Sequence, residues 1–100
     1  MWTATWNRTP VQNAFKHFKD HGADFGAINA LDYVRRARNF LLNPPAGTLT
    51  KIRPNGDVVR YNSATNTFGV LAPNGSPRTF YKPDPAAHGF ATNLDYFHAQ

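Results

Sequence analysis

The chain has 100 residues and a formal net charge of +5, because eleven Lys and Arg residues oppose six Asp and no Glu. A hydrophobic content of 41% indicates one folded domain with a modest core. The chain has no cysteine, which excludes disulfides, thiolate metal sites and a cysteine nucleophile. No apolar run has the length of a membrane helix, and we expect no signal peptide at the start. The basic balance favours a polyanionic partner.

The first predicted helix begins at residue 10, where Thr9 is a candidate N-cap and Pro10 stands at the first helical position. Apolar residues follow at helical spacing and are expected to face the core. We expect Gly22 to end the helix in a left-handed conformation. The apolar residues are Val11, Ala14, Phe15 and Phe18.

A second helix is predicted within "FGAINALDYVRRARNFLLN", residues 25–43, and the following "NPPAG" ends the helical half, residues 10–42. Three arginines, Arg35, Arg36 and Arg38, point mostly outward and are expected to form a solvated face. The expected buried face comprises Ile28, Leu31, Val34, Ala37 and Leu41, widened by Tyr33, Phe40 and Leu42.

Residues 48–83 contain four short strand-like runs separated by turn residues. Asn55-Gly56 and Asn74-Gly75 are hairpin signals, so a four-stranded antiparallel meander is the simplest topology. The whole chain, residues 1–100, is therefore predicted to be one α+β domain, with two N-terminal helices packed on the sheet in two layers. The tail, residues 84–100, begins with a turn and is expected to hold one further helical turn near residues 93–98.

"FKHFKDHG" at residues 15–22 places His17 and His21 four residues apart, on the same side of the predicted helix. An imidazole can accept and donate a proton near neutral pH, so the pair could serve as acid and base at one phosphate. Two other interpretations stand beside this one. The histidines could belong to an ordinary polar helix face, or form half of a metal site completed by Asp20, Asp24 or His88. The residue after His17 is Phe rather than the Glu of the zinc protease motif, which weakens the metal interpretation.

The predicted strands carry a second group of polar residues. Arg60 alternates with Val59 and Tyr61 and should face away from them. In "PRTFYKP", Arg78 and Lys82 share one face, whereas Thr79 and Tyr81 share the other. Such faces can hold a phosphate and stack a base. They are equally compatible with an ordinary sheet whose Arg and Lys side chains are solvated.

The order of these motifs resembles a known group of proteins. "HFKDHGADFG" precedes "ALDYVRRARNFL", which precedes "GDVVRYNSATNTFGVLAPNGSPRTFYKP". Over residues 13–83 this arrangement resembles the small ribonuclease domains of the barnase/EndoU/colicin/RelE-like group. The resemblance is greater to the toxin domains at the C-terminal ends of bacterial contact-dependent growth-inhibition and other polymorphic toxin proteins.

The resemblance implies helices packed on a curved antiparallel sheet and RNA cleavage, often of tRNA, that needs no metal or other cofactor and leaves a 2′,3′-cyclic phosphate. It also implies release from a secreted or cell-surface effector, action in the cytoplasm of a target bacterium, and neutralisation by a cognate immunity protein, expected to be acidic.

The motifs carry the implied site onto particular residues. We expect one histidine to act as base and the other, or Tyr81, as acid, with fixed positive charge at the phosphate. For these residues to form one site, a helix histidine must lie near Arg60 and Thr79. The predicted catalytic residues are His17, His21, Arg60, Thr79 and Tyr81, and the predicted substrate-binding residues are Lys16, Lys19, Arg78 and Lys82.

Two other functions fit the composition. A non-catalytic, basic nucleic-acid-binding module would explain the charge and the strand aromatics without needing two adjacent histidines. A protein-interaction domain with a basic face would instead bind an acidic partner and show no salt-sensitive affinity for nucleic acid.

Overall fold

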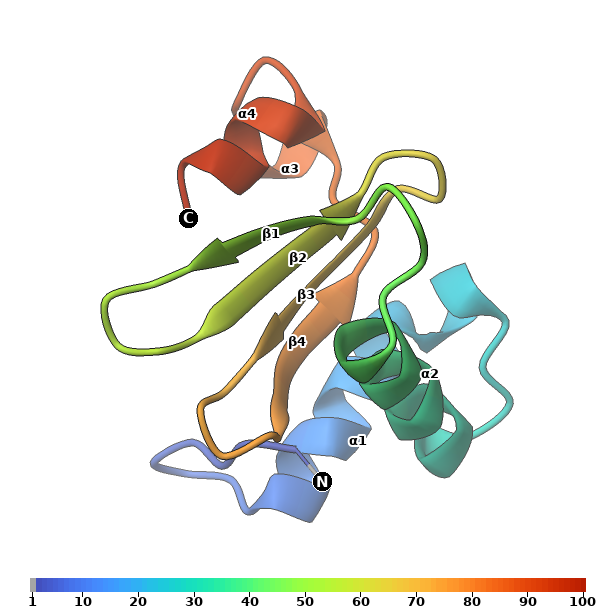
Figure 1. Ribbon diagram of the computed structural model, residues 1–100. Coiled ribbons are helices and arrows are strands. Elements are labelled where there is room, and N and C mark those ends of the chain that lie inside the picture. Colours follow the sequence, from blue (N-terminus) through green and yellow to red (C-terminus); the bar gives the residue numbers. More distant parts are fainter. Residues whose placement is uncertain (1) are drawn as a thin grey trace.

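A computed structural model describes residues 2–100 of the chain and shows an α+β fold with a four-stranded antiparallel sheet (Figure 1). This confirms the predicted fold class. No helix in the described range is both long and apolar enough to span a bilayer. The elements in order are α1 (Pro10–His21), the 3-10 helix η1 (Gly22–Phe25), α2 (Ala30–Leu42), β1 (Leu49–Ile52), β2 (Val58–Asn62), β3 (Thr67–Leu71), β4 (Pro77–Tyr81), α3 (Pro85–His88) and α4 (Asn93–His98).

The sheet is a meander in which the strands lie in the order β1-β2-β3-β4 and each pairs with its neighbour in the sequence. The two predicted Asn-Gly hairpins are present. Gly56 and Gly75 adopt φ values of 91° and 85°, which a residue with a Cβ atom rarely adopts. The side-chain oxygen of the preceding asparagine, Asn55 or Asn74, accepts a hydrogen bond from the backbone N–H two residues later.

One face of the sheet packs against α1 and α2. Gly69 of β3 allows the close approach of α2, because a Cβ atom there would lie 2.9 Å from Cδ2 of Leu41. Tyr33 secures the contact by donating a hydrogen bond from its hydroxyl to the carbonyl of Phe80. This core comprises Trp2, Ala14, Tyr33, Val34, Ala37, Phe40, Leu41 and Phe80.

The opposite face of the sheet is also covered, which makes the fold three-layered rather than two-layered as predicted. Its apolar residues pack against Phe97 of α4, so the helical turn expected near residues 93–98 is confirmed. The short helix α3 was not predicted; Asp84 caps it by accepting from the N–H of Ala86. The sheet residues of this second core are Val59, Tyr61, Phe68 and Val70.

Part of the prediction for the buried helix faces is wrong. Val11, Phe15 and Leu31 are 65%, 52% and 59% exposed. Ile28 is 83% exposed because it precedes α2, which begins only after the N-cap Asn29. The helices instead contact the sheet through a narrower stripe, with Phe18 packed at its edge. Leu42 is also exposed, as are Arg35 and Arg36, whereas Arg38 is half-buried.

The end of α1 also differs from the prediction. Thr9 caps its start as expected and forms a reciprocal capping box with Gln12. Gly22 is not left-handed, however: its φ of −59° is right-handed, and the chain continues into η1 before turning at Gly26, whose φ is 66°. Glycine is required at position 22 for space, since a Cβ atom there would lie 2.5 Å from the Phe18 ring.

Candidate active site

The two helix histidines occupy different environments. The ring of His17 is half-buried against Trp2, with 5.1 Å between ring centroids. Its Nδ1 is buried and has no hydrogen-bond partner in the described part of the chain. Burial, followed by the nearby His21, lowers the pKa of His17 from 6.5 to about 4. His17 is therefore neutral at physiological pH and is held as a packing residue.

His21 is the last residue of α1 and lies at the edge of β4. Its ring stacks on Tyr81 with 5.3 Å between centroids and an interplanar angle of 30°. It lines a pocket of about 260 Å³, here called the histidine pocket. Burial lowers the pKa of His21 as well, opposed by the charges of Asp20 and Asp24. The other residues that line the histidine pocket are Tyr81, Lys82, Asp84, Ala87, His88 and Tyr96.

Tyr81 forms a hydroxyl pair with Tyr96 in this pocket. Burial raises the pKa of Tyr81, and its hydrogen bond with Tyr96 raises the pKa further. Tyr81 therefore remains protonated near neutral pH. Two hydroxyl groups that share one hydrogen bond leave one O–H proton directed elsewhere. The pair can thus donate a proton or a hydrogen bond to a ligand beside His21.

Lys82 brings a positive charge to the same pocket. Its Nζ donates to the carbonyl of Thr65 at 2.6 Å and lies 5.0 Å from the centroid of the Phe25 ring. An ammonium group has three donors, so further donors remain for an anion. Because β4 alternates its side chains, Lys82 follows Tyr81 but faces the α2 side, which places it between the histidine pocket and a second pocket.

His88 also lines the histidine pocket, but both of its ring nitrogens are engaged. Nδ1 accepts from the N–H of Phe90 at 3.1 Å, and Nε2 is 2.8 Å from Oδ1 of Asn93. Both ring nitrogens are therefore occupied by contacts within the tail. His88 also stacks on Tyr96, with 4.3 Å between centroids, and so positions the hydroxyl pair rather than offering a proton.

Arg60 does not join this group, so the predicted combination with His21 and Thr79 is not formed. Its guanidinium faces α2, donating to the carbonyl of Leu41 at 2.8 Å and to Oγ1 of Thr50 at 2.7 Å. Thr79 lies on the opposite face of the sheet, because it pairs with Val70 while Arg60 pairs with Gly69. Strand alternation separates the two side chains, and Thr79 does not line the histidine pocket.

The remaining predicted binding residues lie outside the pocket. Nε of Arg78 donates to Oδ1 of Asp57 at 2.9 Å. Lys16 is exposed and forms an ion pair with Asp20 one turn later. Lys19 is exposed, with its Nζ 6.0 Å from the Phe15 ring centroid. Contact of these three side chains with substrate stays a prediction.

The metal interpretation finds no ligand group. Among residues 2–100, no three His or Asp side chains are arranged so that they could hold a metal ion. Asp20, one of the proposed third ligands, is paired with Lys16, and its hydrogen bond with Lys16 lowers the pKa of its carboxyl.

Sequence reasoning missed the contribution of the tail. Asp84, His88 and Tyr96 line the histidine pocket, yet none was assigned to the predicted catalytic site, and His88 was considered only as a metal ligand. A local signal existed: "DPAAHG" has the N-cap, first-position proline and terminal glycine of a one-turn helix. It indicates a structured tail, but the contact with β4 depends on the tertiary fold.

The chain was compared with known proteins. No family model matches it, and no curated protein sequence does so. Among solved structures, the fold is similar to that of a ribonuclease from Escherichia coli complexed with its inhibitor protein. The two chains are 25% identical with a TM-score of 0.58, and the match covers 82% of this chain and 95% of the other. The similarity thus extends over nearly the whole of that ribonuclease chain and most of this one.

Proposed function

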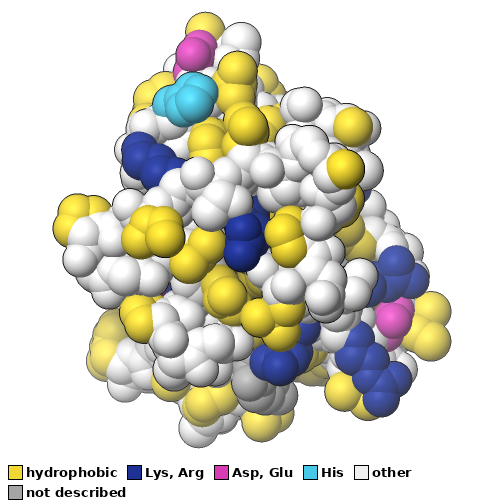
Figure 2. All heavy atoms as spheres, in the orientation of Figure 1, with side chains coloured by type: hydrophobic (Ala, Val, Ile, Leu, Met, Phe, Trp, Pro, Cys, Tyr) yellow, Lys and Arg dark blue, Asp and Glu magenta, His cyan; other side chains and the backbone are white. Residues whose placement is uncertain are grey.

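We propose that this chain is an endoribonuclease whose catalytic base is His21. The observation that carries the proposal is the histidine pocket, where an imidazole, a protonated tyrosine pair and a lysine converge. The fold similarity to a ribonuclease supports the same conclusion. So does the net charge of +5, which suits a polyanionic substrate. Figure 2 shows separate groups of Lys and Arg side chains over the sheet and on the right of this face, with an acidic side chain between the groups on the right.

The proposed reaction begins at the 2′-hydroxyl of RNA. A neutral ring nitrogen of His21 accepts its proton as the oxygen attacks the adjacent phosphorus. The lowered pKa of His21 keeps the ring neutral at physiological pH, as a base must be. His17 does not take part, because its ring is packed against Trp2 and its Nδ1 is buried.

The bond between phosphorus and the 5′-oxygen breaks as the new bond to the 2′-oxygen forms. The free hydroxyl proton of the Tyr81–Tyr96 pair passes to the leaving oxygen, and Lys82 stabilises the charge on the phosphate. The products are a 2′,3′-cyclic phosphate and a 5′-hydroxyl. Before the next turnover, His21 releases its extra proton to solvent and the tyrosine pair takes one up, which restores both groups.

The proposal extends to biological setting. We propose tRNA as the substrate, delivery from a secreted or cell-surface effector into the cytoplasm of a target bacterium, and neutralisation by an acidic cognate immunity protein. The motif resemblance supports the substrate and the delivery. The E. coli ribonuclease was solved with an inhibitor protein, which supports a protein inhibitor here. An acidic inhibitor would match the basic surface and bind with electrostatic steering.

The test compares His21→Ala with His17→Phe on total bacterial RNA in EDTA. We expect wild type and His17→Phe to produce fragments with 2′,3′-cyclic ends. His21→Ala should lose cleavage by about 10²–10⁴-fold, the usual contribution of a general base. His17→Phe preserves an aromatic contact with Trp2 and is the matched control.

Two outcomes would contradict the assignment. Equal cleavage by His21→Ala and wild type would place the base elsewhere. Intact RNA with wild type, together with salt-sensitive RNA binding, would favour a non-catalytic binding module.

A further inference from the structure

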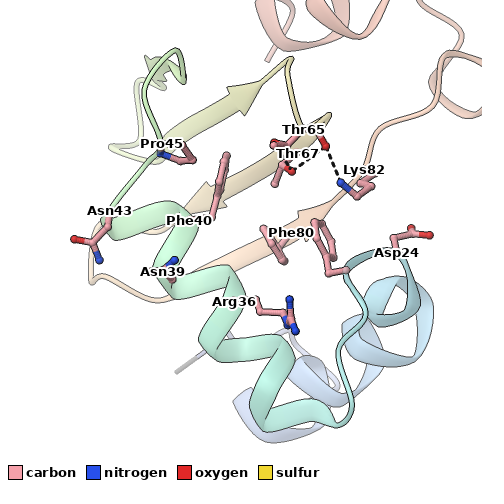
Figure 3. A pocket seen from close by; sticks show the side chains of 11 residues that line it. Asp24, Arg36, Asn39, Phe40, Asn43, Pro45, Thr65, Thr67, Phe80 and Lys82 are labelled. Atoms are coloured by element: carbon pink, nitrogen blue, oxygen red, sulfur yellow. Dashed lines mark hydrogen bonds between the residues drawn. The ribbon is translucent and has the colours of Figure 1, made fainter.

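A second pocket, of about 490 Å³, adjoins the histidine pocket and takes no part in the chemistry above. We call it the α2 pocket; it lies between α2, η1, the β2–β3 turn and β4 (Figure 3). Lys82 lines both pockets, so a phosphate held by Lys82 lies at the boundary between them. The nucleotide joined to that phosphate can therefore enter the α2 pocket directly, with no intervening nucleotide of the RNA chain.

The floor of the α2 pocket is aromatic. Phe40 and Phe80 are 7% and 3% exposed, so their positions are fixed by the core. Phe25 stacks on Phe80 with 4.0 Å between centroids and 16° between planes. Figure 3 shows Phe40 and Phe80 between α2 and the strands, facing the hollow. Because Phe40 and Phe80 expose so little, most of the aromatic surface that a nucleobase could touch belongs to Phe25, whose ring is partly exposed.

The rim of the α2 pocket is polar. Arg36 engages only its Nε, which donates to Asp32 at 3.1 Å; its terminal nitrogens form no hydrogen bond within residues 2–100. Asn39 follows one turn later on α2, and Thr65 and Thr67 stand on the opposite wall. Asp24 is the single carboxylate among the described lining residues, and Figure 3 shows it pointing outward at the rim.

We propose that the α2 pocket binds the unpaired nucleotide next to the scissile phosphate, an inference that rests on the proposed ribonuclease function. Lys82 holds the scissile phosphate, the base packs against Phe25, and Arg36 contacts the following phosphate. Asn39 and Thr65 supply donors and acceptors for the base edge. A base in a duplex is stacked and paired, so it cannot enter the pocket. The substrate class is therefore single-stranded RNA or an RNA loop.

The first measurement is binding, which does not depend on cleavage. Each of the four ribonucleoside 5′-monophosphates is titrated into ¹⁵N-labelled protein, and amide shifts are followed by NMR. We expect shifts at the Asn39 side-chain amide and at the backbone of Phe40 and Lys82. Shifts confined to the histidine pocket or dispersed over the surface would overturn the proposal, whether or not the protein cleaves RNA.

The second measurement is cleavage by matched variants on the same helix. Arg36→Gln combined with Asn39→Ala should lower kcat/KM for a single-stranded oligoribonucleotide about tenfold or more, chiefly through KM. Arg35→Gln removes an exposed charge on α2 that does not line the pocket. It should change kcat/KM less than twofold. Thermal unfolding of each variant controls for loss of fold.

The outcomes separate the two proposals. If the wild type cleaves RNA and the double variant has the same kcat/KM as Arg35→Gln, the α2 pocket is not a subsite and the ribonuclease function stands. If the wild type and the double variant both cleave the stem of an RNA hairpin as fast as its loop, the restriction to unpaired nucleotides is wrong. If wild type does not cleave RNA at all, the ribonuclease function fails, and the titration alone decides nucleotide binding at the α2 pocket.

Discussion

Trp2 covers one of the two helix histidines, His17. The spacing of His17 and His21 predicts that they share a helix side, and their ring centroids are indeed 5.9 Å apart. It does not predict that the chain terminus returns to cover only one of them. Trp2 is held there by its indole N–H, which donates to the carbonyl of Arg78 at 3.1 Å. That contact joins residues 76 positions apart and is invisible to local patterns.

His17 should make stability depend on pH. Its pKa is about 4 in the folded protein and 6.5 in the unfolded chain, so between these values the unfolded state binds more protons. The free energy of unfolding should therefore fall as pH falls from about 6.5 to 4. For a half-buried ring we expect a loss on the order of 2 kcal/mol.

Urea unfolding of wild type and His17→Phe at pH 7 and pH 4 measures this effect. The carboxylates and His21 titrate in both proteins, so the difference between them reports His17. Wild type should lose about 2 kcal/mol more than the variant between the two pH values. An identical loss in both would show that His17 titrates normally.

Asp57 ties two elements of the sheet together. It is the buried carboxylate that follows the first hairpin turn, and its oxygens lie 3.4 Å from Nη1 of Arg53 and 2.9 Å from Nε of Arg78. Burial alone would raise the pKa of its carboxyl, but the hydrogen bonds from Arg78 and Asn55 outweigh burial and lower it. The side chain thus joins the β1–β2 hairpin to β4.

Asp57→Ala should destabilise the fold by about 2–3 kcal/mol, because it leaves two arginines without their shared partner. Asp95→Ala removes an exposed carboxylate from α4 and should cost less than about 0.5 kcal/mol. Chemical denaturation of both variants at pH 7 makes the comparison. Equal stabilities would show that Arg53 and Arg78 are fully solvated without Asp57.

The elements themselves were largely predictable. Hairpin turns depend on adjacent residues, so Asn55-Gly56 and Asn74-Gly75 identified both correctly. The helix faces were predicted less well, because periodicity cannot tell which apolar residues meet the sheet: Phe15 follows the spacing but remains exposed. Gly22 illustrates a different limit, since its role depends on the space beside Phe18 rather than on its backbone angles.

For the candidate site, the sequence predicted His21, Tyr81 and Lys82, which line one pocket. The sequence-based prediction failed for Arg60. The face of the sheet on which Arg60 lies was predicted correctly, but its expected position near a helix histidine was not. It also failed for Tyr96, because no local pattern shows that the tail folds back over β4. Both errors concern contacts between segments far apart in the chain.

The charge of the whole molecule should govern RNA binding. With a net charge of +5, affinity for single-stranded RNA should fall steeply as salt rises, by about 0.7 log units per tenfold salt increase for each phosphate contact. Lys82→Ala, made in the His21→Ala background to prevent cleavage, should reduce this slope by about 0.7.

Fluorescence anisotropy over a range of KCl concentrations provides the slopes. Lys51 is a suitable control, because it donates to the carbonyl of His98 and lines neither the histidine pocket nor the α2 pocket. An equal slope for Lys82→Ala and its parent would remove Lys82 from the phosphate site. Affinity that is insensitive to salt would instead favour a protein-interaction domain.

The contacts of the N-terminal segment also bear on the order of folding. Every strand pairs with its sequence neighbour, so each hairpin closes a short loop and can form early. The N–H of Thr3, by contrast, donates to the carbonyl of Pro77, which closes a loop of most of the chain. We expect the meander to form first and docking of the first residues to complete folding. The environment of His17 would then be the last part of α1 to reach its native state.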